Sequence, residues 1–301
     1  MGDQPGDNPT LVVVGGGRMG FALVKGLTSR SRGPGDGRVP DGAVDRAREQ
    51  AEGHEDQPSE RRHYSELLIV EPDDRRREEL ESELGQLSDV RLSPRVVEAG
   101  DAILAVKPKD AEVAARQLAS SGARRVLSVV AGIRCSSLES WLGKRAVVVR
   151  SMPNTPALLG HGISALSGGS NATEDDLRWA EGLLGEVGEV VRVPEESLDA
   201  VTGLSGSGPA YVFLVAEALI EAGVLAGLPR PVSEKLAIGT MNGATRMLAE
   251  SGESPEALRA QVTSPGGTTA EGIRVLEARA VRSAFFEAVA AASRRSAELA
   301  N

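Results

Sequence analysis

The sequence predicts an α/β N-terminal domain followed by an all-α C-terminal domain, and three observations support this prediction. Between residues 11 and 193, short apolar runs alternate with stretches of helical apolar spacing, which is typical of a parallel sheet with helices on both faces. The first apolar run ends in three glycines. After residue 198, apolar residues recur only at helical spacing, so we expect no further strand.

The N-terminal domain is expected to span residues 10–196. Its predicted strands are residues 11–14, 67–70, 102–106, 125–130, 146–150, 163–166 and 190–193. Its predicted helices are residues 19–27, 74–84, 111–120, 136–142 and 174–184. Residues 31–62 are polar and rich in Gly, Pro, Asp, Arg and Glu, so they are predicted to be a disordered insertion, with an ordered recognition loop as the alternative.

The C-terminal domain is expected to span residues 197–301 and to consist of helices only. Apolar residues such as Val212, Leu219 and Leu236 recur at helical spacing there, and the predicted helices are apolar on more than one face. A domain this small cannot bury so much apolar surface by itself. We therefore expect it to be a dimerisation domain whose apolar faces are covered by a second subunit in a homodimer.

The composition is that of a globular protein without a polyanionic partner. The 301 residues are 41% hydrophobic and 26% charged, with a formal net charge of -9, whereas nucleic acids and anionic membranes attract a basic surface. No uninterrupted run of about 18 apolar residues occurs, and residues 1–9 lack an apolar signal core. We expect a cytoplasmic protein that binds neither nucleic acid nor membrane. Cys135 and the three scattered histidines have no spacing suited to a metal site.

The three glycines belong to a G-x-G-x-x-G pattern that follows a predicted strand and opens a predicted helix. In this setting the glycines allow a tight turn and the close approach of a pyrophosphate, which the helix N-terminus faces. The pattern therefore predicts a dinucleotide site of the Rossmann type, with a plain glycine-rich turn as the alternative. Its residues are Gly15, Gly16, Gly17, Arg18, Met19 and Gly20.

The residues after the second predicted strand leave the choice of nucleotide open. Glu71 stands where a carboxylate hydrogen-bonds the ribose 2′-hydroxyl and repels a 2′-phosphate, which favours NADH. Arg75, Arg76 and Arg77 favour a 2′-phosphate, although a charged first turn of a surface helix explains them equally well. We therefore expect NADPH or NADH as the cofactor.

Three other strand ends are candidates for the same site, because such sheets bind ligands at the carboxyl edge of their strands. The alternative for each is an ordinary strand end, and Asn154 is either a ligand donor or a turn residue. The candidates are Ala105, Val106, Lys107 and Pro108; Val129, Val130 and Ala131; and Asn154 within Arg150 to Pro156.

Three segments make the chain resemble the pyrroline-5-carboxylate reductases. They are RSMPNTP at 150–156, DAVTGLSGSGPAY at 199–211 and QVTSPGGTT at 261–269, and their order and spacing match that family. The resemblance implies reduction of 1-pyrroline-5-carboxylate to L-proline, the last step of proline biosynthesis, with NAD(P)H. It also implies an N-terminal Rossmann domain and a helical domain that interlocks in a dimer, which often assembles further into decamers.

The resemblance implies roles for single residues. Cofactor contacts correspond to Val14, Gly15, Gly16, Gly17, Arg18 and Met19, to Ala105 to Pro108, to Val129 to Ala131 and to Gln261. Substrate contacts correspond to Thr268, Thr269 and Glu195. Three departures from the family put the cofactor preference in question: Arg18 replaces a residue that is more often neutral, the insertion is unusual, and the strand before Ala105 is one residue short.

The segment from Ser264 to Thr269 suits a cyclic imine that carries a carboxylate. Gly266 and Gly267 expose main-chain N–H groups before a predicted helix at residues 270–276, and a helix N-terminus favours an anion. The hydroxyl of Thr268 or Thr269 can hydrogen-bond the imine nitrogen, and we expect Thr269 to be the catalytic residue. The alternative is a helix-capping turn without a ligand.

The sequence is short of groups that could protonate an alkoxide, as reduction of a carbonyl requires. Tyr64 flanks the insertion, Tyr211 has Val215 rather than a lysine four residues later, and no lysine occurs between Ser205 and Ala210. An imine is basic enough to arrive protonated, so the shortage favours imine reduction. Two alternatives stay open: reduction of another cyclic imino acid, and a protein that binds a dinucleotide and a proline-like ligand without turnover.

Overall fold

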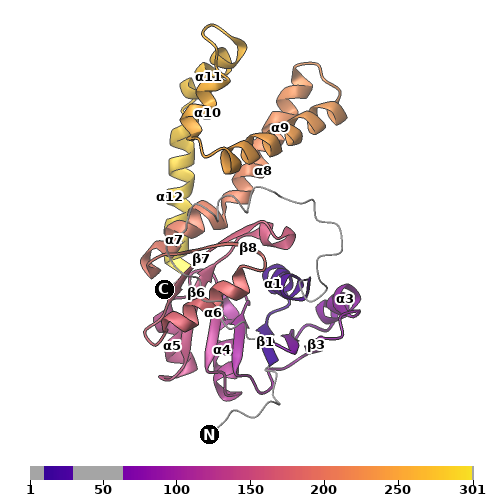
Figure 1. Cartoon of the computed structure of the whole chain (residues 1–301), viewed down its shortest axis with the longest axis vertical. Coiled ribbons are helices and arrows are strands. Elements are labelled where there is room, and N and C mark those ends of the chain that lie inside the picture. Colours follow the sequence, from indigo (N-terminus) through magenta and orange to yellow (C-terminus); the bar gives the residue numbers. More distant parts are fainter. Residues whose placement is uncertain (1–9, 30–63, 300–301) are drawn as a thin grey trace. The chain divides into compact units, whose positions relative to one another are not determined.

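The structure is a computed structural model that describes residues 10–29 and 64–299 (Figure 1). These residues form two compact units, the first made of residues 10–29, 64–207 and 291–299 and the second of residues 208–290. The insertion predicted at residues 31–62 lies outside the described residues. The domain boundary predicted between residues 196 and 197 stays a prediction, while the two units divide between Ser207 and Gly208.

The first unit is built on one eight-stranded sheet. Its strands are β1 (Thr10–Val14), β2 (Glu66–Val70), β3 (Val90–Ser93), β4 (Asp101–Leu104), β5 (Arg125–Ser128), β6 (Val147–Met152), β7 (Gly162–Gly168) and β8 (Gly188–Arg192). Their order in the sheet is β3-β2-β1-β4-β5-β6-β7-β8. The direction of winding reverses between β1 and β4, which is the doubly wound arrangement whose crevice binds ligands. The predicted α/β Rossmann-type domain is therefore confirmed.

Strand β7 corrects the expectation of an all-parallel sheet. It pairs antiparallel with β6, whereas β8 pairs parallel with β7. Only the short helical turn η3 (Thr155–Leu159) connects β6 to β7, and a parallel crossover needs about a dozen residues or more, normally with a helix. The short connection therefore forces the chain to reverse direction. Edge strand β3 was not predicted either, and its residues are exposed or half-buried.

In the part of the chain that the structure describes, the five helices predicted for the first unit are found at nearly the predicted positions. They are α1 (Arg18–Ser29), α3 (Asp74–Leu84), α4 (Ala111–Ser120), α5 (Cys135–Leu142) and α6 (Glu174–Leu184). Helix α3 begins after Asp73, whose side chain accepts a hydrogen bond from the Arg76 N–H. Helix α6 begins with a reciprocal pair of bonds between Thr173 and Asp176, which satisfies two N–H groups that lack partners in the helix.

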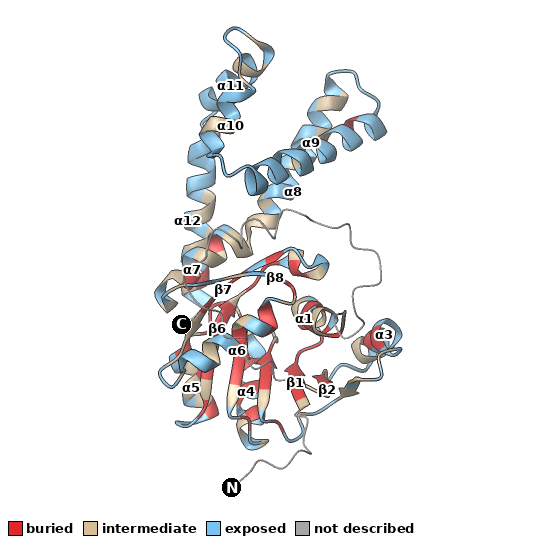
Figure 2. Cartoon of the chain, in the orientation of Figure 1, coloured by how far each residue is buried: buried red, intermediate tan, exposed pale blue. Residues whose placement is uncertain are grey.

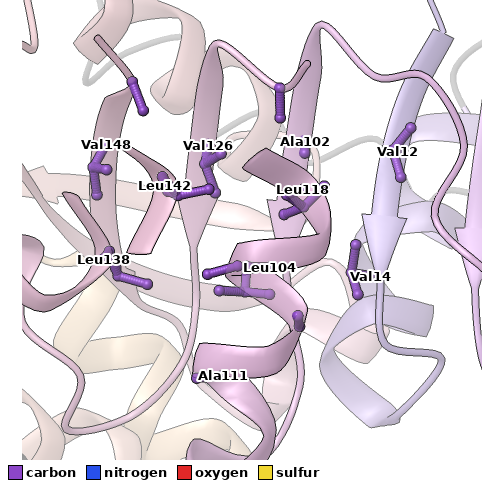
Figure 3. Close-up of a cluster of buried hydrophobic side chains, with 14 of the residues drawn as sticks. Val12, Val14, Ala102, Leu104, Ala111, Leu118, Val126, Leu138, Leu142 and Val148 are labelled. Carbon is purple, nitrogen blue, oxygen red and sulfur yellow. The ribbon is translucent and has the colours of Figure 1, made fainter. Parts of the chain in front are cut away.

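Each face of the sheet has its own buried cluster. Val12 and Val14 of β1 pack into one cluster with α4 and α5, and Figure 3 shows these side chains with those of β4, β5 and β6. Leu11 and Val13 of the same strand pack into the other cluster, with α1, α3 and α6. Successive side chains of a strand point to opposite faces, so the continuous apolar run in β1 reflects burial on both sides.

The second unit consists of helices with almost no buried side chains. Its helices are α8 (Gly208–Leu225), α9 (Arg230–Glu250), α10 (Pro255–Gln261), α11 (Thr268–Ala278) and the first part of α12 (Val281–Leu299). Within residues 208–290, Ser233 is the one buried residue (Figure 2). Large apolar side chains such as Phe213, Leu225 and Phe286 are exposed. This matches the expectation that another subunit covers these faces, since monomers rarely expose so large an apolar surface.

One helical stretch among the described residues, Glu195–Leu225, is apolar and long enough to cross a membrane by length and composition alone. The mean hydropathy of its most apolar 18-residue window is 1.5, and none of that window is buried within the chain. Glu217 and Glu221 interrupt the run, which is why the sequence contains no continuous apolar span there.

Candidate active site

Main-chain hydrogen bonds place the predicted cofactor residues at one edge of the sheet. The Gly15 N–H donates to the Val70 carbonyl over 2.9 Å, and the Ala105 N–H donates to the Val14 carbonyl over 2.8 Å. The Val129 N–H likewise donates to the last residue of β4 over 3.0 Å. These bonds continue the strand ladders past the ends of the strands. The segments after β1, β2, β4 and β5 therefore lie next to one another at the carboxyl edge.

The glycine turn after β1 is packed too closely for side chains. Gly15 has a φ of 110°, and a Cβ there would lie 2.5 Å from the Ala105 carbonyl oxygen. A Cβ on Gly20 would lie 2.0 Å from the Gly15 carbonyl oxygen. Gly17, in contrast, is exposed, and a Cβ there would point into open space. The turn thus presents bare main chain at the N-terminus of α1, which suits the pyrophosphate of a dinucleotide.

The carboxylate of Glu71 faces this glycine turn. Its Oε2 accepts a hydrogen bond from the Gly16 N–H over 2.9 Å, and its Oε1 accepts one from the Asp73 N–H over 3.1 Å. Arg76 donates from Nε to the Gly16 carbonyl over 2.8 Å, and Arg77 donates to the Glu71 carbonyl over 2.7 Å. The predicted ribose carboxylate and two of the three arginines are therefore close to the glycine turn.

The loop after β5 is covered by the C-terminal end of α12. Val130 is buried, and Val129 and Ala131 are half-buried. Gly132 has a φ of 79°, and a Cβ there would lie 3.0 Å from the Cβ of Leu299. On the neighbouring loop, Lys107 is exposed. The cofactor roles predicted for residues 105–108 and 129–131 stay predictions.

Asn154 occupies the turn between β6 and β7. Its Oδ1 accepts a hydrogen bond from the Ile163 N–H over 3.0 Å, and its Nδ2 donates to the Ser205 carbonyl over 3.4 Å. Ser205 lies in a π-helical turn, η5 (Thr202–Gly206), and such turns occur often at functional sites. The side chain of Asn154 thus holds a turn together, while its predicted contact with the cofactor stays a prediction.

Glu195 is half of a largely buried ion pair. Its Oε1 accepts hydrogen bonds from the Cys135 N–H over 2.7 Å and from Arg150 over 3.1 Å. Arg150 is 3% exposed and also lies 3.9 Å from Asp199. Burial opposes ionisation of Glu195, but the hydrogen bonds from Cys135 and Arg150 outweigh it and lower its pKa below the ordinary value. The predicted substrate role of Glu195 stays a prediction beside this ion pair.

Arg150 and Asp199 were not predicted as members of a charged cluster. Asp199 also accepts a hydrogen bond from Ser296 over 2.7 Å, so the cluster joins the end of α12 to β6. The sequence contains one usable signal: Arg150 interrupts the otherwise apolar run of β6. A charge inside such a strand needs a buried partner, but the sequence does not identify that partner.

Cys135 is a buried structural residue at the start of α5. The pKa of its thiol is raised to about 12, mainly by burial and to a smaller extent by the adjacent Glu195 carboxylate. Reactive cysteines instead have a lowered thiol pKa and access to solvent. Cys135 therefore fills space in the core as a small buried side chain and is not an activated thiol.

The predicted substrate segment lies in the second unit. Gly266 has a φ of 69°, and Gly267 is the N-cap of α11, which begins at Thr268. The first N–H groups of α11 therefore come directly after the two glycines. They have no partners within the helix, as is general for the first turn of a helix. Gln261 ends α10 and donates a hydrogen bond to Glu253. The ligand contacts predicted for Gly266, Gly267, Thr268, Thr269 and Gln261 stay predictions.

Tyr64 is not placed to act as an acid at the carboxyl edge. Its hydroxyl donates to Asp101 over 2.7 Å and accepts from Trp179 over 2.7 Å. Asp101 is the first residue of β4, so this contact lies at the opposite, amino edge of the sheet. Burial is the larger cause and the charge of Asp101 the smaller cause that raise the pKa of the tyrosine.

Within residues 10–29 and 64–299, no cluster of three His, Cys, Asp or Glu side chains could hold a metal ion.

Comparisons with known proteins identify the family. The family model described as pyrroline-5-carboxylate reductase dimerisation matches residues 195–299. The chain is 45% identical over 242 residues to the pyrroline-5-carboxylate reductase of Synechocystis sp., covering 78% of this chain and 88% of the relative. It is 38% identical over 295 residues to the enzyme of that name from Corynebacterium melassecola, covering 96% and 98%.

Solved structures agree with the sequence relatives. A pyrroline-5-carboxylate reductase from Coxiella burnetii matches with a TM-score of 0.78 and 30% identity, over 98% of this chain and all of the other. The Plasmodium falciparum pyrroline carboxylate reductase, solved with NADP bound, matches with a TM-score of 0.75 and 25% identity, over 98% and 99%. The predicted resemblance is confirmed, and the chain belongs to the pyrroline-5-carboxylate reductase family.

Proposed function

We propose that this chain reduces 1-pyrroline-5-carboxylate to L-proline with NADPH or NADH, the last step of proline biosynthesis. The main support is the convergence of four strand ends on a bare glycine turn, in a chain that belongs to the pyrroline-5-carboxylate reductases over nearly its whole length. The close packing of Gly15 and Gly20, which excludes side chains, fits a dinucleotide.

The residues at the carboxyl edge would hold the cofactor. Gly15, Gly16 and Gly17 approach the pyrophosphate, and Glu71 accepts a hydrogen bond from the adenosine ribose. The strand-end loops at residues 105–108 and 129–131 line the nicotinamide, with Asn154 and Gln261 as further contacts. When bound, the nicotinamide supplies the hydride.

The loop before α11 would hold the substrate. The N–H groups that follow Gly267 in the first turn of α11 bind the carboxylate, because they have no partners within the helix and the helix dipole favours an anion there. Thr269 hydrogen-bonds the ring nitrogen through its hydroxyl and so orients the imine carbon for reduction. Thr268 and Glu195 complete the proposed substrate contacts. No acidic side chain has to deliver a proton to the ring nitrogen, because the basic imine arrives protonated or takes its proton from water.

The helical unit would form a homodimer. Its exposed apolar side chains lie within the residues matched by the dimerisation model, and a partner chain covers them. This pairing also accounts for the apolar character of Glu195–Leu225, so no membrane is needed to explain it. We assign residues 10–196 to dinucleotide binding and residues 197–301 to dimerisation and substrate binding. Assembly into decamers and a cytoplasmic location complete the proposal.

The test is the loss of absorbance at 340 nm when pyrroline-5-carboxylate is added to the full chain with NADH or NADPH. We expect oxidation of the nucleotide and formation of L-proline in equal amounts. The six-membered cyclic imino acid, assayed in parallel, separates this function from reduction of a larger ring. Binding of nucleotide without any oxidation would contradict the proposal and favour a protein that only binds.

A further inference from the structure

We infer that Glu71 makes this enzyme bind NADH in preference to NADPH. The inference rests on the proposed function, because it names the nucleotide of the same site. The sequence left this choice open between the carboxylate of Glu71 and the three arginines that follow it. The structure distinguishes them by what each side chain already contacts.

The Glu71 carboxylate is fixed in place by the main chain around it. Its two oxygens accept hydrogen bonds from the N–H groups of Gly16 and Asp73, over 2.9 and 3.1 Å. Its own main chain is held as well, because its N–H donates to the Ser93 carbonyl over 3.0 Å and its carbonyl accepts from Arg77. The negative charge therefore stands beside the glycine turn in a defined position.

A fixed carboxylate at this place discriminates between the two nucleotides. In NADH the ribose carries a 2′-hydroxyl, which can donate a hydrogen bond to the carboxylate. In NADPH the same position carries a phosphate, which is mostly doubly ionised near neutral pH and repels the carboxylate. A like charge set against a ligand is a repulsive element, and specificity often depends on such elements.

Of the three arginines that follow Glu71, Arg76 contacts the glycine turn, and it already has other partners. Its Nε donates to the Gly16 carbonyl over 2.8 Å. Its Nη1 lies 2.8 Å from the Glu79 carboxylate and 3.8 Å from that of Glu83. The positive charge of Arg76 is therefore offset by two carboxylates of its own helix. Its contacts hold the glycine turn and leave no open phosphate site on this side chain.

The other two arginines are no better placed. Arg77 pairs with Asp74 and donates to the Glu71 carbonyl, so it braces the main chain of the carboxylate. The side chain of Arg75 is 89% exposed and points to Glu79 on the surface of α3. Between residues 71 and 84 the chain has seven carboxylates against three arginines. The net negative charge of this segment therefore adds to the repulsion of a 2′-phosphate.

The test compares dissociation constants of the full-length protein for NADH and NADPH, measured by titration calorimetry without substrate. We expect NADH to bind at least about tenfold more tightly. Glu71→Gln keeps the size of the side chain and an oxygen that can accept from Gly16, but removes the charge. In this variant, the Kd for NADPH divided by the Kd for NADH should be about tenfold lower than in the unaltered protein. The main reason is that the variant should bind NADPH more tightly. Glu71→Ser is a second variant for the case in which the glutamine variant does not fold.

Arg76→Met is the matched control for the opposing hypothesis. It keeps the aliphatic stem and removes the charge, and we expect the ratio of the two dissociation constants to change by less than about threefold. A smaller or reversed preference in the unaltered protein would overturn the inference, and so would a selective loss of NADPH affinity in Arg76→Met. Failure to bind either nucleotide would instead contradict the proposed function, so the two failures are distinguishable.

Discussion

Replacing Glu195 by glutamine would separate the two roles open to this carboxylate, the ion pair and the proposed substrate contact. Glutamine has nearly the same size, and its side-chain oxygen can still accept from the Cys135 N–H. It cannot balance the charge of Arg150, whose side chain is 3% exposed. If the ion pair is the main role of Glu195, the variant should lose stability before it loses substrate affinity.

The expected loss follows from the surroundings of the pair. Removing one partner of a fully buried ion pair costs about 3–5 kcal/mol, because the other charge is left uncompensated. The Glu195 side chain is 26% exposed, and Asp199 stays within 3.9 Å of Arg150. Both features reduce the cost, so we expect the free energy of unfolding to fall by about 1–3 kcal/mol.

Urea unfolding at a fixed protomer concentration measures this change, and its pH dependence gives a second readout. The folded state lowers the pKa of Glu195. The stability that its ionised form contributes is therefore present above the ordinary pKa of a glutamate and is lost as the pH falls through the folded-state pKa. Glu195→Gln has no such group to protonate, so the difference between the two proteins should shrink on acidification.

The control is Glu196→Gln, which removes the neighbouring exposed carboxylate. We expect it to leave the free energy of unfolding within about 0.5 kcal/mol of the unaltered protein. An unchanged stability of Glu195→Gln near neutral pH, together with a KM for the imine raised about tenfold, would refute the reasoning. It would show that the carboxylate serves the substrate and that the ion pair is incidental.

Three further predictions concern other parts of the molecule. Thr269→Val should raise the barrier by about 1–3 kcal/mol, measured as kcat/KM for the imine, with nucleotide affinity unchanged; an unaltered kcat/KM would remove this hydroxyl from the reaction. Gly132→Ala should lower the free energy of unfolding by about 1–3 kcal/mol, because its φ is 79° and its Cβ would meet Leu299 at 3.0 Å. Gly122→Ala, which shares the positive φ but meets nothing nearer than 4.0 Å, should cost less, and equal losses would exclude the contact as the cause. Cys135, with a thiol pKa raised to about 12, should resist iodoacetamide in the folded protein, and its contribution to stability should fall as the pH rises from the ordinary thiol pKa towards 12. Cys135→Ala should lack this alkaline loss, and rapid alkylation of the folded protein would contradict the burial argument.

Most of the first unit could be predicted from sequence because its elements are strongly patterned. The apolar runs of the central strands and the helical spacing of α3, α4 and α6 predicted nearly the observed bounds. Strand β3 was missed because its four residues, VRLS, form a half-exposed edge with neither alternation nor a long apolar run. The direction of β7 was missed because direction depends on the length of the connection, which no residue type encodes.

Some residues of the candidate site could be predicted from sequence, and others could not. The glycine turn and Glu71 could be predicted because their conformations and charges are local properties of a strand, a turn and a helix. The pairing of Glu195 with Arg150 could not, because it joins residues far apart in the chain through tertiary packing. The choice between Glu71 and the arginines likewise required their contacts, since the sequence shows the charges but not how they are already paired.

The return of α12 to the first unit has a consequence for biosynthesis of the chain. Residues 291–299 belong to this unit although the entire second unit is translated before them. The sheet can therefore begin to fold on the ribosome, but the loop at Gly132 and the carboxylate of Asp199 must wait for Leu299 and Ser296. N-terminal domains commonly finish folding before the rest of a protein emerges. Here the unit that is begun first is completed last, after the helical unit has left the ribosome.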